Sequence, residues 1–198
     1  MLIPLVVVAA LTFVTAGVFA YGAAKRNNIV HNHLVLPTVK GEIEETFTPE
    51  EPIEIGGEAQ TKEIVIKNTG DSSFFVRVMV FPEISTTAGN LLPANLGTEI
   101  LVDLGSDWED GEDGYFYYKG KVAKATETPA LFTKVALADG LDSAYEGANF
   151  SMQVKSETVT ASNHQYRKVW WNKAVDTAPT ETAWKTVDDV LAPLITTP

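Results

Sequence analysis

The chain has 198 residues, no cysteine and a formal net charge of −11 at pH 7. The lack of cysteine excludes thiol catalysis, zinc–thiolate sites and cysteine-ligated iron–sulfur clusters. The acidic balance repels phosphate backbones, so the sequence predicts no nucleic-acid partner. A domain of this size can bury a sufficient core without disulfides, even outside the cytoplasm.

The amino terminus is a long apolar segment. Residues 1–24 contain no charged side chain, and Leu2–Ala20 consists mostly of Leu, Val, Ala and Phe. An export signal ends its apolar core in small residues of the A-x-A kind, which here predicts cleavage after Ala20 or after Gly22. We therefore interpret residues 1–22 as a signal peptide and expect the mature protein to be extracellular or on the cell surface.

Two other interpretations of this segment stay open. An apolar run of about 18 or more residues is long enough to span a bilayer as a helix. Lys25 and Arg26 would then flank a retained membrane anchor. The second alternative is a buried core helix. In either of the export interpretations, contact with a membrane is expected only through this segment.

After the signal, β-prone runs alternate with Gly and Pro at the short spacing of an all-β sandwich or barrel. The predicted strands span residues 42–47, 62–67, 74–81, 99–104, 115–119, 131–137 and 149–160. The second and third strands, joined by the turn Asn68–Asp71, predict a long hairpin that ends at Pro82. We expect Val65 to face the core together with Val76 and Val78.

These elements predict an all-β fold, an antiparallel β-sandwich over residues 38–172, with an N-terminal signal helix and a short C-terminal helix. Residues 23–37 form a separate N-terminal segment, and residues 173–198 form a tail. Helix is predicted only in this tail, from Thr180–Leu191, begun by a Thr cap and ended near Pro193.

Two groups of side chains have residue types that bind metals: His31, His33, Asp107, Asp110 and Asp113. The two histidines alternate along a β-prone stretch and would point to one face, but two such ligands need a third. The aspartates lie in an acidic loop whose oxygens suit calcium, although the loop does not fit the EF-hand pattern. A solvated hairpin tip is the other interpretation. We therefore assign no metal, cofactor or catalytic residue.

The aromatic run Tyr115–Tyr118 has the composition of a carbohydrate-stacking surface. Strand alternation, however, puts Tyr115 and Tyr117 on one face and Phe116 and Tyr118 on the other. At least half of the run is therefore expected to be core. The sequence also lacks the H-E-x-x-H and G-x-S-x-G motifs of helical zinc proteases and serine hydrolases.

A series of short motifs, in a fixed order, covers most of residues 19–160. The motifs are Phe19-Ala20-Tyr21, Asn32-His33, Gly41-Glu42-Ile43-Glu44-Glu45-Thr46-Phe47-Thr48-Pro49, Lys67-Asn68-Thr69-Gly70, Phe75-Val76-Arg77-Val78, Trp108, Asp113-Gly114-Tyr115-Phe116-Tyr117-Tyr118 and Ser156-Glu157-Thr158-Val159. In this order they resemble Gram-positive exported proteins whose signal peptide is cut by a dedicated signal peptidase of the SipW type. That family is related to the TasA and camelysin biofilm-fibre proteins.

The resemblance implies a jelly-roll-like sandwich and a secreted or cell-surface structural protein that self-associates into an extracellular fibre or biofilm matrix. In fibre-forming members, an N-terminal segment of one subunit completes a sheet of the next, which is strand addition to an open edge. The β-prone segment Asn28–Leu36, ended by Pro37, is the expected donor. Ile29, Leu34 and Leu36 are the side chains expected to fill apolar pockets of the neighbour.

Two other functions are considered. One is a camelysin-like metalloprotease that uses His31, His33 and an acidic partner, and the other is a surface module that binds carbohydrate or host protein. We expect no enzymatic activity, because no catalytic set is recognisable. The chain also departs from its relatives, since Gly22–Arg26 replaces their aromatic–Thr–Asp stretch and Trp170-Trp171 has no counterpart there.

Overall fold

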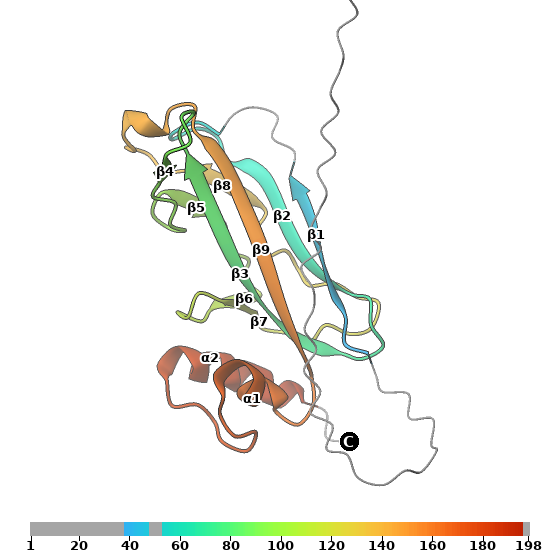
Figure 1. The fold of residues 1–198 in the computed structure, drawn as a ribbon. Coiled ribbons are helices and arrows are strands. Elements are labelled where there is room, and N and C mark those ends of the chain that lie inside the picture. The colour runs from blue at the N-terminus through green and yellow to red at the C-terminus, as the bar shows by residue number, and fades with distance from the viewer. Residues whose placement is uncertain (1–37, 48–52, 196–198) are drawn as a thin grey trace, which may run out of the picture.

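The computed structural model describes residues 38–47 and 53–195 (Figure 1). The expected signal helix and donor segment lie outside the described residues. The described part is an all-β, sandwich-like fold of mostly antiparallel sheets with few helices. Its strands are β1 Gly41–Phe47, β2 Gln60–Asn68, β3 Phe74–Ser85, β4 Leu91–Leu92, β5 Ile100–Val102, β6 Trp108–Asp110, β7 Phe116–Tyr118, β8 Lys134–Leu137 and β9 Asn149–Thr160. Its helices are α1 Gln165–Trp171 and α2 Thr182–Leu191, with 3-10 turns at Ser143–Tyr145 and Ala192–Leu194.

The strands form two sheets (Figure 1). The first has the order β1-β2-β8-β5, and the second has the order β4-β3-β7-β6, with β9 on the other edge of β3. Every ladder between these strands is antiparallel. The longest ladder joins β3 to β9 from Phe74 opposite Thr160 to Ser85 opposite Asn149. The predicted range of β9 is confirmed at both ends.

The predicted hairpin of β2 and β3 is wrong, because the two strands lie in different sheets. The chain crosses between the sheets at Asn68, which is buried. Its Nδ2 donates to the backbone oxygens of Ser72 at 2.9 Å and Val122 at 3.0 Å, and its Oδ1 accepts from the Gly70 N–H at 2.9 Å. A Cβ on Gly70 would lie only 2.3 Å from the Thr38 oxygen. The side-chain amide of Asn68 is therefore buried with all of these hydrogen bonds made. It stabilises a crossover between the two sheets at the position where the sequence predicts a hairpin turn.

β3 does not end at Pro82 but continues to Ser85. One edge of β3 pairs with β7 at residues 77–78 and with β4 at residues 84–85, while β9 pairs with the other edge throughout. Between these two short ladders the first edge of β3 has no neighbour among the described strands. Pro82 falls in this interval, where a residue without an N–H can stay in a strand.

The core between the sheets is built from alternate residues. Ile64 and Ile66 of β2 and Val76 and Val78 of β3 are fully buried in one cluster. The predicted inward facing of Val65 is therefore wrong, since this half-buried residue points to the opposite face. Three consecutive apolar residues show no alternation, so the sequence does not say which face of β2 is inside.

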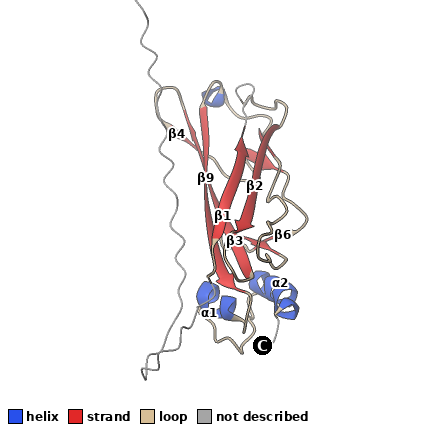
Figure 2. Ribbon diagram, turned by 90° about the vertical axis from the view of Figure 1, so that its right-hand side faces the viewer, coloured by secondary structure: helices blue, strands red, loops and turns tan. Residues whose placement is uncertain are grey.

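Helices α1 and α2 cover the outer face of the second sheet at one end (Figures 1 and 2). The shared apolar cluster contains Phe75, Tyr117, Val159, Ala161, Tyr166, Trp170, Trp171, Val187 and Leu191. α1 was not predicted, and the expectation that helix is confined to the tail is wrong. Asn163, His164 and Asn172, which flank this helix of about two turns, adopt positive φ angles of 47°, 50° and 52°. Asn and His are among the residues that tolerate this conformation.

α2 confirms the predicted tail helix, with a different start. Its N-cap is Glu181, and no side chain caps the first turn, so the expected Thr cap is wrong. A 3-10 turn that contains Pro193 follows the helix, in agreement with the predicted end. No helix within residues 38–47 and 53–195 combines the length and apolar character needed to cross a bilayer.

Candidate functional site

One long strand edge has no partner among the described residues. β9 pairs with β3 on one edge only, over all twelve of its residues. β1, one of the two edge strands of the first sheet, comes close to β9 where Gly41 lies against Thr158, and it does not pair with β9. Figure 2 shows the two strands near each other. We call the place where these two edges meet the β1–β9 seam. An unpaired edge presents backbone N–H and C=O groups to another strand.

The inward side chains of β9 divide into two halves. Phe150, Met152 and Val154 form an apolar half that packs against the core, and Ser156 and Thr158 continue the row with hydroxyl groups. All five side chains are only half-buried. They are half-buried because β9 is an edge strand, so a strand added at this edge would cover the row.

The seam is tight at the hydroxyl end of β9. A Cβ on Gly41 of β1 would lie 2.9 Å from Thr158 Cγ2 and 3.3 Å from Phe74 Cζ. Thr158 Oγ1 is buried there and has no hydrogen-bond partner. The apolar half of the row lies toward the opposite end, near Asn149. Space for an added side chain is therefore more restricted beside Thr158.

The two edges of the seam differ in charge. β1 carries the exposed residues Glu42, Glu44 and Glu45, each paired with a lysine at 2.6–2.9 Å. On β9 the exposed residues Ser151 and Gln153 are uncharged, whereas the exposed Lys155 is paired with Glu157 of the same strand at 2.6 Å. Charged side chains on an edge strand oppose pairing with another chain. The uncharged half of β9, residues 149–154, is therefore the more receptive part of the two edges.

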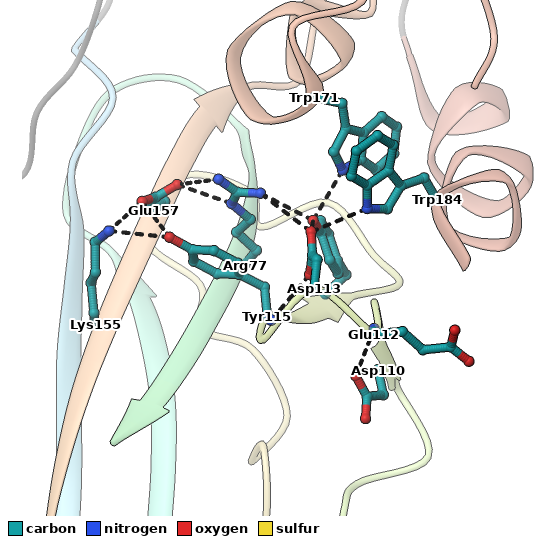
Figure 3. A network of polar contacts seen from close by, with 10 residues as sticks. Arg77, Asp110, Glu112, Asp113, Tyr115, Lys155, Glu157, Trp171 and Trp184 are labelled. Atoms are coloured by element: carbon teal, nitrogen blue, oxygen red, sulfur yellow. Dashed lines mark hydrogen bonds and ion pairs between the residues drawn. The ribbon is translucent and has the colours of Figure 1, made fainter. Parts of the chain in front are cut away.

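A second feature is a polar network on the outer face of the second sheet (Figure 3). Its centre is Arg77 of β3, which is 8 % exposed. Arg77 Nε and Nη2 donate to Glu157 Oε2 at 2.9 and 2.7 Å, and Nη1 donates to Tyr117 Oη at 3.0 Å. The guanidinium carbon lies 3.8 Å from the centroid of the Tyr115 ring. The buried cation is thus satisfied by hydrogen bonds and by an aromatic face.

Asp113 connects this network to the helices (Figure 3). Its Oδ2 accepts from Tyr117 Oη at 2.7 Å and from Trp184 Nε1 of α2 at 3.2 Å. Trp171 Nε1 of α1 donates to Tyr117 Oη at 3.0 Å, and the Trp171 and Trp184 rings stack at a centroid distance of 5.7 Å. The acidic turn after β6 therefore anchors the helices to the sheet.

Two groups of the network, Glu157 and Tyr117, have strongly shifted pKa values. Burial raises the pKa of Glu157, but hydrogen bonds from Lys155, Arg77 and Tyr115 outweigh it and lower this pKa to about 2. Burial and the hydrogen bond to Asp113 raise the pKa of Tyr117 to about 12. Neither group changes charge near neutral pH, where a general acid or base needs its pKa. The geometry suits attachment of the helices rather than proton transfer.

The three aspartates considered as metal ligands have separate roles. Asp113 binds the two side chains described above, Asp110 Oδ1 accepts from the Glu112 N–H at 2.9 Å, and the Asp107 backbone oxygen accepts from the Lys119 N–H at 2.8 Å. Within the described ranges, no three His, Asp or Glu side chains are grouped so that they could hold a metal ion. The predicted hairpin tip is found as the turn between β6 and β7.

The remaining candidate residues lie outside the described residues. They are the cleavage positions Ala20 and Gly22, the histidines His31 and His33, and the assembly residues Ile29, Leu34 and Leu36. The polar network was missed by the sequence analysis. Its one signal in the sequence is Arg77, a single cation within an otherwise apolar strand, since a buried arginine requires a partner.

Comparisons of the chain with family models, with curated proteins and with solved structures give no match.

Proposed function

We propose that the protein is an extracellular structural subunit that polymerises by β-strand addition. The acceptor is the free edge of β9, and the donor is residues 28–36 of a second copy. The observation that carries this proposal is a twelve-residue unpaired edge whose inward apolar row is only half-buried. Export and a jelly-roll topology belong to the same proposal, and their support is the apolar amino terminus and the resemblance of the motifs.

Strand addition stabilises a complex through two terms. The donor backbone satisfies the free N–H and C=O groups of β9, and donor side chains cover Phe150, Met152 and Val154. Full burial of such a side chain contributes about 1.5–3 kcal/mol, so completing a half-buried one contributes roughly 1 kcal/mol. Three such side chains and a continuous ladder of backbone hydrogen bonds together stabilise the contact between subunits.

The donor segment has a matching pattern. In a strand, Leu34 and Leu36 share one face with Val30, whereas Ile29 lies on the other face. We therefore assign Leu34 and Leu36 to the inward row of the acceptor. Ile29 would point to the outer surface of the second sheet.

The acceptor is tested by two lysine substitutions at neighbouring positions of β9. Val154→Lys puts an ammonium group into the inward row, where a charge opposes strand addition, and Gln153→Lys makes a charge change on the exposed face. Negative-stain microscopy of the secreted protein should show filaments for the unmodified chain and for Gln153→Lys. Val154→Lys should stay monomeric with an unchanged circular-dichroism spectrum. Monomers of the unmodified chain, or equal polymerisation of both variants, contradict the proposal.

The donor is tested by deletion of residues 23–36 from the mature protein. The product should be a folded monomer that no longer polymerises. A synthetic peptide of residues 28–36 should bind this monomer and raise its melting temperature, because a ligand of the native state adds about 2.7 kcal/mol of stability at one hundred times its Kd. Normal polymerisation of the deletion variant would rule out this segment as the donor.

A further inference from the structure

We infer that Asn149 is a site of N-linked glycosylation, and that the attached sugar lies over the exposed side chains Phe81 and Leu91. The inference goes beyond the proposed function and rests on it only for export, because this modification is found on exported proteins. It is carried by the sequence around Asn149, by the exposure of its side chain and by the bare sheet face beside it.

The sequence contains one glycosylation tripeptide. Asn149-Phe150-Ser151 has the form N-x-S/T with a residue other than proline in the middle, which is the pattern that N-glycosylation requires. None of the eight other asparagines has Ser or Thr two positions later. Tripeptides of this form also occur by chance, so the position of these side chains in the fold decides whether the site can be modified.

The fold presents both polar side chains of the tripeptide to solvent. Asn149 is the first residue of β9, and the turn before it contains Gly147 with a positive φ of 65°. Asn149 and Ser151 are exposed on the outer face of the second sheet, whereas Phe150 packs against the core. The tripeptide therefore lies where a surface turn enters a strand, and a large group can be attached there without disturbing the core.

The carboxamide of Asn149 is not used by the fold. Within the described residues, its side chain has no hydrogen-bond partner. By contrast, Asn68 Nδ2 donates to two backbone oxygens, and Asn95 Nδ2 donates to Glu99 Oε2 at 2.9 Å. The amide nitrogen of Asn149, which is the atom that reacts, can therefore be modified without the loss of a structural hydrogen bond.

The modification forms one bond and breaks one. The amide nitrogen of Asn149 attacks C1 of a sugar whose C1 oxygen is linked to a polyprenyl phosphate or diphosphate, which is the co-reactant. The bond between C1 and this oxygen breaks, and the polyprenyl phosphate leaves with the electron pair. The nitrogen loses one proton to a base of the transferring enzyme. No atom is oxidised or reduced, and the product is an N-glycosidic bond on Asn149.

An apolar patch beside Asn149 gives the sugar a surface to cover. The helices α1 and α2 lie at the other end of the second sheet, and at this end Leu91 and Phe81 are 70 % and 47 % exposed. Leu91 is opposite Ser85 of β3, and Ser85 is opposite Asn149, so these residues form one row across the outer face. Neighbouring strands are about 4.8 Å apart, which puts Leu91 roughly 10 Å from Asn149. A sugar chain on Asn149 would reach this patch, and the backbone edge of β9 would stay free.

Mass spectrometry of the secreted protein, isolated from the cells that produce it, tests the site. Trypsin cleaves after Lys134 and Lys155, and the peptide between these cleavage points contains Asn149 as its only asparagine. This peptide should carry the mass of one or more sugar residues. Asn149→Gln and Ser151→Ala should each abolish the modification, whereas Ser151→Thr, which keeps a hydroxyl group, should retain it.

Two results would overturn the site and leave strand addition standing. One is an unmodified peptide in the secreted protein, and the other is a modification that persists in the Asn149→Gln variant. Cell fractionation separates these results from a failure of the proposed function. If the protein is found only inside the cells, export and the glycosylation site are rejected together.

An apolar dye whose fluorescence rises on binding tests the cover over the patch. The secreted Asn149→Gln variant should bind more dye than the glycosylated protein, because Phe81 and Leu91 are then uncovered. Leu91→Ser in the same chain should reduce this excess. Equal dye binding by the glycosylated protein and the Asn149→Gln variant would overturn the position assigned to the sugar.

Discussion

The two faces of the second sheet are stabilised in different ways. On the inner face, Val76, Val78 and Val80 pack against the first sheet through apolar contacts alone. On the outer face, Arg77 and Tyr117 add hydrogen bonds to an aromatic cluster that holds α1 and α2. Apolar burial is non-directional, whereas a buried hydrogen-bond network accepts only one arrangement. We therefore expect the inner face to respond to lost volume and the outer face to respond to lost polar partners.

The largest effect is expected from the ion pair that joins the two helices. Arg167 Nε and Nη2 donate to the two oxygens of Asp188 at 2.6 and 2.8 Å, and Tyr166 Oη donates to Oδ1 at 2.7 Å. Asp188→Ala removes the carboxylate from the buried guanidinium, whose Nη1 still donates to the Val175 oxygen, and should reduce the free energy of unfolding by about 3–5 kcal/mol. Denaturant unfolding measures this loss.

The matched control removes both charges, with Arg167→Met and Asp188→Leu in one chain. Its loss should be clearly smaller than that of Asp188→Ala, because no unpaired buried charge remains. Equal losses for the two proteins would show that packing, not charge pairing, is the sensitive property of the outer face.

The inner face should be sensitive to volume. Ile66→Ala removes fully buried methyl and methylene groups and should cost about 2–5 kcal/mol, and Val78→Ala should cost somewhat less. Val65→Ala on the half-buried opposite face is the control and should cost less than either. Thermal unfolding compares all three. A loss for Val65→Ala as large as that for Ile66→Ala would contradict the assigned facing of β2.

Two Tyr→Phe substitutions compare the stability lost when a hydroxyl group of the polar network is removed with the stability lost when a single hydrogen bond is removed. Tyr117→Phe leaves Arg77 Nη1 and Trp171 Nε1 without their acceptor, and should cost about 2–3 kcal/mol. Tyr145→Phe removes a single bond to the Pro93 oxygen and should cost about 1 kcal/mol. Urea unfolding of both variants gives the difference. Similar losses would mean that the network adds no cooperativity to the outer face.

The smallest effect is expected from acid. The pKa of Glu157 is lowered to about 2 in the folded protein, from an ordinary value of 4.5. A lowered pKa contributes stability above pH 4.5, and this contribution is lost as the pH falls toward about 2. Glu157→Gln should therefore flatten the dependence of stability on pH over this interval. Glu83→Gln, which removes an exposed carboxylate of β3 that is not part of the network, is the control for the loss of one charge.

Local patterns predicted most strands but not their neighbours. The alternation of Phe150, Met152 and Val154 marks β9, and its range is confirmed from Asn149 to Thr160. The pairing of β3 with β9 could not be predicted, because 72 positions separate Arg77 from Asn149 at the start of β9 (149 − 77), and the alternation of apolar residues does not indicate which strand is the partner. The hairpin of β2 and β3 was inferred from proximity in sequence and is wrong for the same reason.

The candidate acceptor shows the same limit. The sequence alone indicated a β-prone donor segment and a β-rich domain, since both depend on residues within one short window. It could not indicate which strand has a free edge, since an edge is defined by the absence of a neighbour. The free edge of β9 can be identified only when the pairing of all the described strands is known.

The sequence by itself determined the all-β class, the periodic inner face of β3 and the tail helix, because period and composition act locally. Only the tertiary structure decided the side of β2 that is buried, the existence of α1 and the partners of Arg77. Each of these depends on groups distant in sequence, such as the contact of Asp113 with Trp184 across 71 positions. Burial and tertiary hydrogen bonds are properties of the folded chain as a whole, and they cannot be predicted from any short segment of the sequence.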